Sequence, residues 1–348
     1  MSAMSCRSTP NAVSGLTRRR LIGGAVAAIL LAGCSGPATD GGEEAASGAG
    51  FPVSIEHAFG STTIPQEPVR VVAWGWGSAD AAIALGVVPV AIPFQAYGGD
   101  EQGVLPWIAE ELERQGAPMP EVLPDAQDAP VEAIAAMNPD VILAPYSGIT
   151  DSEYALLSNI APTVAYPEQP WATPWRETIQ IVGNALGRPD RAQELLAGID
   201  EEIAAQAQAH PEFQGRSVAV VFDYAGTFSV YKPADPRVQF TLDLGFEHAE
   251  SVDRLANGDE TFYYDLSYER LGELDSDILV SYADSAELSD TFLASPPAQL
   301  MEQVRAGAVA EVVGQDFVAS VGPPTALSLT WGLEDYVARL AEAVGNLG

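Results

Sequence analysis

The chain has 348 residues, 47% of them hydrophobic, and its 48 acidic against 16 basic residues produce a formal net charge of −32. This charge argues against nucleic-acid binding, because contacts to phosphate need basic patches. The roughly 300 residues that follow a short leading segment exceed what one compact core usually holds, so two lobes are expected.

Residues 1–33 are predicted to be a signal peptide. Three arginines at 18–20 precede an apolar run over 21–32, which is shorter than the ~20 apolar residues of a membrane span. The paired arginines favour twin-arginine (Tat) export, and the third leaves Sec export open. The run ends in Leu-Ala-Gly-Cys, which resembles the bacterial lipobox. This resemblance implies a lipidated Cys34 that anchors the protein to the outer face of the cell membrane; the alternative is a plain signal peptide with a chance cysteine.

The two cysteines agree with an exported chain. Cys6 lies inside the predicted signal peptide, so the mature chain would keep only Cys34 and could form no internal disulfide. Residues 34–50 are rich in glycine, alanine, serine and acidic residues, without apolar periodicity. This composition predicts a flexible tether.

Short apolar runs alternate with helical segments over residues 51–172, the predicted N-terminal lobe. Apolar strands separated by helices indicate a parallel sheet covered on both faces. The predicted strands are Val69–Ala73, Val87–Ile92, Asp140–Ala144 and Thr163–Tyr166. The predicted helices are Ser78–Leu85, Val131–Met137 and Ser152–Ile160.

Residues 173–210 are predicted to form a helical bridge. A first helix with an apolar stripe stops at Gly187. A second helix begins with Pro189 in its first position and ends before Pro211. At 1.5 Å per residue the second helix spans about 30 Å, which is enough to connect two lobes.

Residues 211–348 repeat the alternation and form the predicted C-terminal lobe. The clearest strands are Ser217–Phe222 and Ile278–Tyr282. The helix candidates are Val238–Leu244, Tyr268–Gly272, Ala298–Val304 and Trp331–Val344.

Five segments over roughly residues 51–345 carry a family resemblance: Gly60–Pro65, Pro68–Val72, Leu85–Val90, Val131–Ile142 and Leu186–Arg188. In this order and spacing, the chain resembles the periplasmic-type binding proteins of iron-siderophore, haem and cobalamin importers. The resemblance implies an α/β fold of two Rossmann-like lobes with parallel-rich central sheets, joined by a long rigid helix. It also implies an extracytoplasmic solute-binding lipoprotein of an ABC importer, monomeric and without a cofactor, whose partners are its solute and the ABC permease.

Signals of catalysis or metal binding are weak. The segment Gly75–Asp80 lacks the third glycine of a dinucleotide loop. Ser229–Lys232 matches the Ser-x-x-Lys of penicillin-recognising enzymes, but it falls in a predicted β-hairpin rather than at a helix start. The histidines His57, His210 and His248 form no ligand-spaced pair. We expect no catalytic residues and no metal site; a metal-ion receptor or an enzyme on a similar two-lobed frame is the alternative.

Aromatic residues gather where the predicted strands end. Ligands of open α/β sheets bind beyond the carboxyl ends of the strands, and tryptophan and tyrosine suit a bulky chelate of mixed polarity. Core packing is the alternative for each residue taken singly. The candidate ligand-binding residues are Trp74, Trp76, Phe94, Tyr97, Tyr146, Trp171, Tyr224, Tyr231, Arg237, Tyr282 and Trp331.

Basic residues are scarce around this predicted cleft. An anionic tricatecholate complex would favour several arginines. Only Arg237 stands where a pocket residue is expected, although Arg114 or Arg254 could also reach in. The pattern favours a near-neutral iron-siderophore chelate, such as a ferric hydroxamate, in which the chelator itself encloses the iron. Cobalamin and haem are the alternatives within the same family.

Two glutamates occupy equivalent places in the two halves. Glu132 and Glu269 each open a predicted helix that leads into an apolar strand. The family resemblance implies that one glutamate from each lobe docks onto arginines of the permease, and these two residues match. The alternative is an ordinary helix-start acid, which gains about 0.3–1 kcal/mol from the helix dipole.

Overall fold

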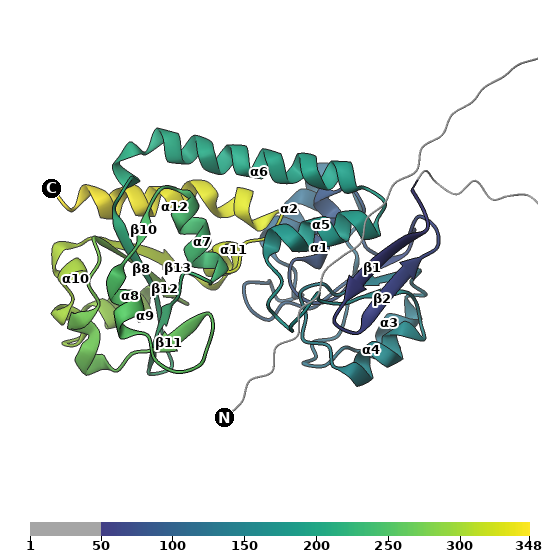
Figure 1. Cartoon of the computed structure of the whole chain (residues 1–348), viewed down its shortest axis with the longest axis horizontal. Helices are drawn as coiled ribbons and strands as arrows, with labels where there is room; N and C mark the ends of the chain where they lie inside the picture. Colours follow the sequence, from purple (N-terminus) through teal and green to yellow (C-terminus); the bar gives the residue numbers. More distant parts are fainter. Residues whose placement is uncertain (1–49) are drawn as a thin grey trace, which may run out of the picture. The chain divides into compact units, whose positions relative to one another are not determined.

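Two β-sheets organise residues 50–348, the part of the chain that the computed structural model describes (Figure 1). The predicted signal peptide, Cys34 and the rest of residues 1–49 lie outside the described residues. The first sheet has the strand order β5-β4-β3-β6-β7 and is parallel throughout, as predicted. Its strands are β3 (Val71–Ala73), β4 (Ala91–Ile92), β5 (Glu121–Val122), β6 (Val141–Leu143) and β7 (Thr163–Val164).

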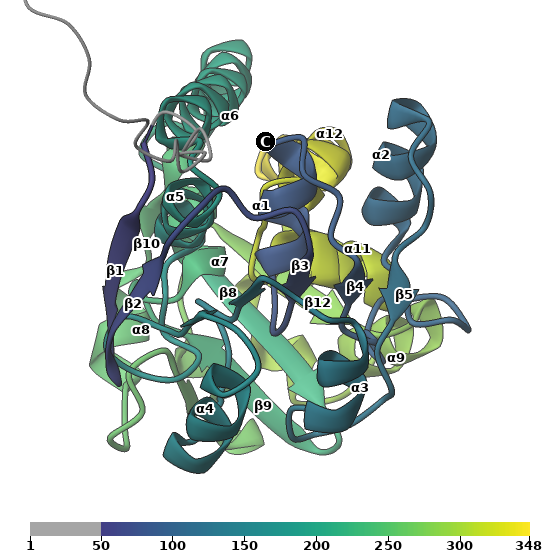
Figure 2. The same ribbon diagram turned by 90° about the vertical axis from the view of Figure 1, so that its right-hand side faces the viewer.

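Helices cover both faces of the first sheet (Figure 2). Side chains alternate along β3, so Val71 and Val72 point to opposite faces of the sheet. Val71 packs with the helices over 78–84 and 175–185, whereas Val72 packs with the helices over 131–136 and 151–158. An antiparallel hairpin of β1 (Val53–His57) and β2 (Gly60–Ile64) precedes the sheet. The helices are α1 (Ser78–Ala84), α2 (Pro106–Gln115), α3 (Val131–Ala136), α4 (Asp151–Ser158) and α5 (Trp175–Ala185).

The predicted strand Val87–Ile92 is wrong over its first four residues. The N–H of Val87 closes the end of α1 by donating to the carbonyl of Ala82 at 2.9 Å. Pro89 has no N–H to offer a neighbouring strand. Only the last two residues of the predicted strand therefore remain in the sheet, as β4.

Two helices connect the lobes, and both were predicted. α5 is followed by α6 (Pro189–Ala209), with the break at Gly187, which has a φ of 66°. The two helices cross closely because Gly183 has no Cβ, which would collide with that of Ala192. Buried residues of both helices belong to one apolar cluster that includes strands of both sheets. The connection is therefore packed into both cores.

The second sheet is mixed. Its order is β11-β9-β8-β12-β13, and β10 pairs with the start of β8. β8, β10, β12 and β13 are parallel, whereas β9 and β11 are antiparallel to their neighbours. The strands are β8 (Ser217–Tyr224), β9 (Thr227–Tyr231), β10 (Glu247–His248), β11 (Tyr263–Asp265), β12 (Ile278–Ala283) and β13 (Val309–Val313).

The helices of the second lobe differ from prediction at two places. The predicted helix Tyr268–Gly272 is a 3₁₀-helix, η2 (Tyr268–Glu273). The predicted helix Ala298–Val304 is interrupted because Met301 is extended and buries its side chain in the core. The other helices are η1 (Pro211–Phe213), α7 (Pro236–Asp243), α8 (Glu250–Leu255), α9 (Ala286–Leu293), η3 (Ala298–Leu300), α10 (Glu302–Ala306), α11 (Gln315–Val321) and α12 (Ser328–Gly345). Across residues 50–348, no helix combines the length and apolar character that crossing a bilayer requires.

Candidate ligand-binding cleft

Loops from both lobes enclose a pocket next to α5. The first lobe contributes Trp76 and Tyr146, and the second contributes Pro236 and residues 323–326. A wider groove adjoins the loop that follows β4, and we call the pocket and this groove together the cleft. Both lie beyond the carboxyl ends of strands, where open α/β sheets bind ligands. The groove is lined by Gly98, Gly99, Asp100, Val104, Pro106, Ala109, Asp284, Gln315 and Asp316.

Trp76 is fixed between the lobes. Its backbone N–H donates to the carbonyl oxygen of Tyr146 at 3.0 Å, and its indole Nε1 donates to the carbonyl oxygen of Pro323 at 3.0 Å. Gly75 has a φ of 82°, and a Cβ at this position would collide with the Tyr146 carbonyl. A glycine is therefore what allows Trp76 and Tyr146 to meet in the cleft.

Trp171 stands beside Tyr146. The two rings are edge-on, with centroids 5.7 Å apart, and the backbone N–H of Trp171 donates to the carbonyl of Ser147 at 3.1 Å. Trp171 has a φ of 57°, in the left-handed region, and its indole packs on Gly148. About half of its surface, 52%, is exposed. This aromatic face is available to a ligand.

Tyr97 reaches across the cleft from the first lobe. Its hydroxyl donates to Asp284 Oδ1 at 2.7 Å. Burial, followed by this hydrogen bond, raises the pKa of Tyr97, so the phenol stays protonated. Phe94, in the same loop, is partly buried against Gly103, where a Cβ would collide with the ring. Sequence reasoning missed Asp284, which directly follows β12.

Arg237 supplies a cation from the second lobe. Its guanidinium carbon lies 3.9 Å from the centroid of the Tyr231 ring. Asp235 Oδ1 accepts from Arg237 Nε at 2.8 Å and from the Arg237 backbone N–H at 2.9 Å, where it caps α7. Burial lowers the pKa of Arg237, but the interactions with Asp235, Tyr231 and Tyr282 together more than offset this, so the pKa is raised and the guanidinium stays charged.

The positive charge of Arg237 affects the pKa of tyrosines in both lobes. Burial raises the pKa of Tyr146, and Arg237 opposes that shift from across the cleft. Burial also raises the pKa of Tyr231 and Tyr282, and Arg237 again opposes it. One guanidinium therefore faces neutral phenols from both sides.

Tyr224 and Phe222 extend the aromatic surface of the second lobe. Their centroids are 5.5 Å apart, and Phe222 lies 6.4 Å from the Tyr282 ring. Tyr224 is exposed, whereas Phe222 is partly buried. Sequence reasoning missed Phe222, although the residue ends a predicted strand and the carboxyl-end argument applied to it.

Of the predicted contact residues, Trp76 and Tyr146 line the pocket and none lines the groove. Trp74, Tyr282 and Trp331 are packed elsewhere. Trp74 is 9% exposed and packs in the first-lobe core with residues of α3 and α4. Tyr282 is 1% exposed and belongs to the cluster that contains α7 and α12. Trp331 packs on Trp107 of α2, with centroids 5.6 Å apart, and its Nε1 donates to Glu110 Oε1 at 3.2 Å. Trp331 thus supports the contact between lobes.

A buried carboxylate forms a hydrogen bond between the two lobes beside the pocket. Asp80 of α1 accepts from Trp107 Nε1 at 2.6 Å and from the Thr325 hydroxyl of the second lobe. Burial raises the pKa of Asp80, and the hydrogen bonds from Thr325 and Trp107 oppose this shift. Sequence reasoning missed this group, because an acid inside a helix usually faces solvent.

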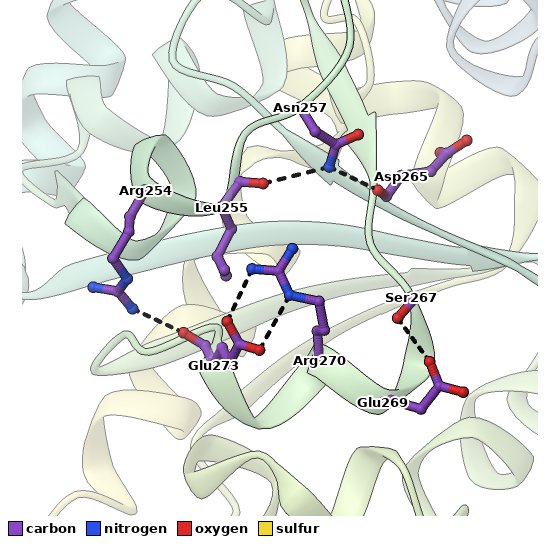
Figure 3. Close-up of polar contacts among 8 residues, drawn as sticks. All are labelled: Arg254, Leu255, Asn257, Asp265, Ser267, Glu269, Arg270 and Glu273. Carbon is purple, nitrogen blue, oxygen red and sulfur yellow. Dashed lines mark hydrogen bonds and ion pairs between the residues drawn. The ribbon is translucent and has the colours of Figure 1, made fainter.

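The two candidate docking glutamates are exposed. Glu132 is the second residue of α3, and Glu269 is the second residue of η2. The Glu269 carboxylate accepts from Ser267 Oγ at 3.0 Å and points away from the neighbouring ion pair of Arg270 and Glu273 (Figure 3). Its charge is therefore not neutralised by that arginine.

Residues 50–348 contain no group of three or more histidine, cysteine or acidic side chains arranged to hold a metal. Each histidine bonds to a near neighbour in the sequence. The nitrogen–oxygen distances are 2.9 Å for His57 and Thr62, 2.8 Å for His210 and Glu212, and 2.8 Å for His248 and Asp253.

Two α/β lobes, joined by helices that pack into both cores, with an aromatic cleft between them, define a solute-binding protein. The family described as periplasmic binding protein matches residues 71–314. The chain belongs to this family, as the order of its elements had indicated, and it is a solute receptor rather than an enzyme.

Relatives cover most of the chain. PiaA of Streptococcus pneumoniae TIGR4, solved in complex with ferrichrome, is 33% identical, with 84% of this chain and 99% of PiaA covered at a TM-score of 0.75. A periplasmic solute binding protein from Mycobacterium smegmatis is 28% identical, with 84% and 99% covered at a TM-score of 0.73. The probable siderophore-binding lipoprotein YfiY of Bacillus subtilis is 26% identical over 75% of this chain and 78% of its own length.

Proposed function

We propose that this protein captures an iron-siderophore chelate in the cleft and delivers it to an ABC importer, with a ferric hydroxamate as the favoured ligand. The observation that carries the proposal is the pocket where Trp76 and Tyr146 of the first lobe meet Pro236 and residues 323–326 of the second. The Tyr97–Asp284 hydrogen bond and the ion pair of Arg237 with Asp235 lie at its side. The similarity to PiaA, which was solved with ferrichrome, supports the same ligand class.

The chemistry of the cleft suits a ferric trihydroxamate. Such a chelate presents apolar methylenes around a core of iron-bound oxygens. The tryptophan and tyrosine faces cover the apolar part, and the Arg237 guanidinium donates to the oxygens. The chelator fills the coordination sphere of the iron, so the protein needs no ligand of its own.

A fluorescence titration tests this function. The protein is titrated with ferrichrome, ferric dicitrate, a ferric tricatecholate, haem and cobalamin. Ferrichrome should quench the emission of Trp76 and Trp171 at micromolar concentration or below. Binding of haem or cobalamin without binding of any ferric chelate would overturn the proposed ligand class.

The same proposal includes the path of the protein to the membrane. Residues 1–33 direct export, Cys34 carries lipid, and residues 34–50 tether a monomer formed by lobe 51–172, bridge 173–210 and lobe 211–348. The lipobox-like end of the apolar run and the lipoprotein names of relatives support this assignment. Cys34→Ala in a bacterial host should accumulate unprocessed precursor without lipid; normal processing and detergent partitioning would contradict the anchor.

Delivery is assigned to one glutamate in each lobe. Glu132 and Glu269 are exposed, and each begins the helical segment that precedes a central strand of its sheet. Two carboxylates on separate lobes can bind two arginine sites on a permease. Loaded and empty protein would then dock through the same two points.

A further inference from the structure

The cation of the cleft is already paired. Arg237 Nε donates to Asp235 Oδ1 at 2.8 Å, and Asp235 is only 2% exposed. The carboxylate therefore lies behind the guanidinium, whose flat face covers the Tyr231 ring. A ligand that meets this guanidinium meets an ion pair rather than an isolated positive charge.

No second cation compensates for Asp235. The described residues that line the pocket and the groove include no lysine, arginine or histidine, and Arg237 borders the pocket next to the lining residue Pro236. The groove instead carries Asp284, which accepts from Tyr97, together with two further aspartates. Lys232, next to Tyr231, is held elsewhere because its Nζ donates to the carbonyl of Glu260 at 2.6 Å. The electrostatic potential in the cleft is therefore neutral to negative.

We infer that Asp235 sets the charge selectivity of the cleft, so that neutral and cationic ferric chelates are accepted and anionic ones are disfavoured. This inference rests on the proposed function and refines its ligand class. The pairing leaves Arg237 able to donate hydrogen bonds to neutral chelate oxygens. It removes the net attraction that an unpaired guanidinium would exert on a carboxylate or catecholate complex in a poorly solvated site.

The position of Asp235 allows its charge to be removed alone. Asparagine is as good a helix cap as aspartate, so Asp235→Asn keeps an acceptor for the N–H at the start of α7. Asp235→Ser is a second uncharged cap if the asparagine variant folds poorly. Asp243→Asn is the matched control, because it removes one negative charge from the other end of α7, where Asp243 forms an exposed ion pair with Arg176.

The test compares four probes of different charge in each variant. Ferrichrome is neutral, ferrioxamine B is cationic, and ferric dicitrate and a ferric tricatecholate are anionic. Wild-type protein should bind the first two more tightly than the last two. Asp235→Asn should improve the affinity for the anionic probes, relative to ferrichrome, by about tenfold, whereas Asp243→Asn should leave that ratio within about twofold.

The possible failures are distinct. All four probes could bind with the same ratio of anionic-probe affinity to ferrichrome affinity in wild type, Asp235→Asn and Asp235→Ser. In that case Asp235 does not set selectivity and the inference is wrong, while the proposed function stands. A wild-type preference for the tricatecholate overturns the inference as well. If no ferric chelate binds to wild type, the proposed function fails, and the inference fails with it.

Discussion

The two lobes build their halves of the cleft by different means. The first lobe presents Trp76 and Trp171 from loops whose backbone is unusual, with Gly75 at a φ of 82° and Trp171 itself at 57°. The second lobe presents Tyr231 at the end of a strand and Arg237 in the first turn of a helix, in ordinary backbone. The first half of the cleft therefore depends on exact loop conformation, whereas the second depends on sheet register and on one ion pair.

We expect the largest changes in stability and affinity from a substitution in the first-lobe loop that contains Gly75. Gly75→Ala should destabilise the protein by about 2–3 kcal/mol, because the left-handed conformation disfavours a Cβ and this Cβ would collide with the Tyr146 carbonyl. Affinity for ferrichrome should fall too, since Trp76 is displaced. Denaturant unfolding and the fluorescence titration measure both quantities.

Gly116→Ala is the control for Gly75→Ala. Gly116 has a φ of 63° and open space around it, so only the conformational cost, about 1–2 kcal/mol, should remain, without loss of affinity. Equal losses of stability and affinity in both variants would mean that close packing of the Gly75 loop has no special role in the cleft.

Truncation of aromatic side chains in the first lobe distinguishes residues of the cleft from residues of the core. Trp76→Ala and Tyr97→Ala should each weaken ferrichrome binding by about 1–3 kcal/mol, the range for an aromatic anchor. Trp74→Phe should lower stability and leave affinity unchanged, because Trp74 is buried in the first-lobe core. Calorimetric titration measures the affinities. If Trp74→Phe weakened binding and the other two variants did not, the assigned first-lobe surface would be wrong.

Although the two lobes build the cleft differently, we expect them to contribute equally to docking onto the permease. Glu132→Ala and Glu269→Ala should leave ferrichrome affinity and melting temperature unchanged but reduce uptake severalfold, with the double variant the slowest, since each removes one charged contact at a rim. Glu287→Ala, an exposed acid of α9, is the control. Uptake at the wild-type rate by the double variant would mean that both residues are ordinary acids at helix starts and do not dock onto the permease.

The smallest effect concerns Asp80, which fastens the lobes to each other. Because burial raises its pKa above 3.8 in the folded protein, its contribution to stability is complete below pH 3.8 and is lost as pH rises through the folded pKa. The unfolding free energy of wild type minus that of Asp80→Asn should therefore decrease with rising pH. A difference that stays constant or increases over this range would contradict the buried carboxylate.

The same contrast explains which parts of the site could be predicted from sequence. Tyr231 ends a strand of the predicted hairpin, and Arg237 follows Pro236 at a helix start, so strand and helix-start signals reach both residues. Trp74 shows the limit of the carboxyl-end argument. It continues the alternation of Val72 and so turns to the covered face of the sheet.

Other parts depend on packing between distant segments. The Thr325 hydroxyl meets Asp80, and Asp284 meets Tyr97, only once both lobes have folded. No local pattern reports such pairs.

The sequence analysis did not predict α2. Pro106 at its start and the apolar residues Trp107 and Leu112 are signals of a helix, but a long loop precedes them and the start of the element was not recognised. Cys34 and the export segment lie outside the described residues, so these assignments stay predictions.

The proposed function requires that a ferric chelate binds between the two lobes. A crystal of the protein grown with ferrichrome, measured at the iron absorption edge, locates the metal directly. We expect one anomalous peak in the cleft, with Trp76 and Tyr97 on one side of the chelate and Tyr231 and Arg237 on the other. Iron bound anywhere else, or a cleft that stays empty at saturating ferrichrome, would contradict it.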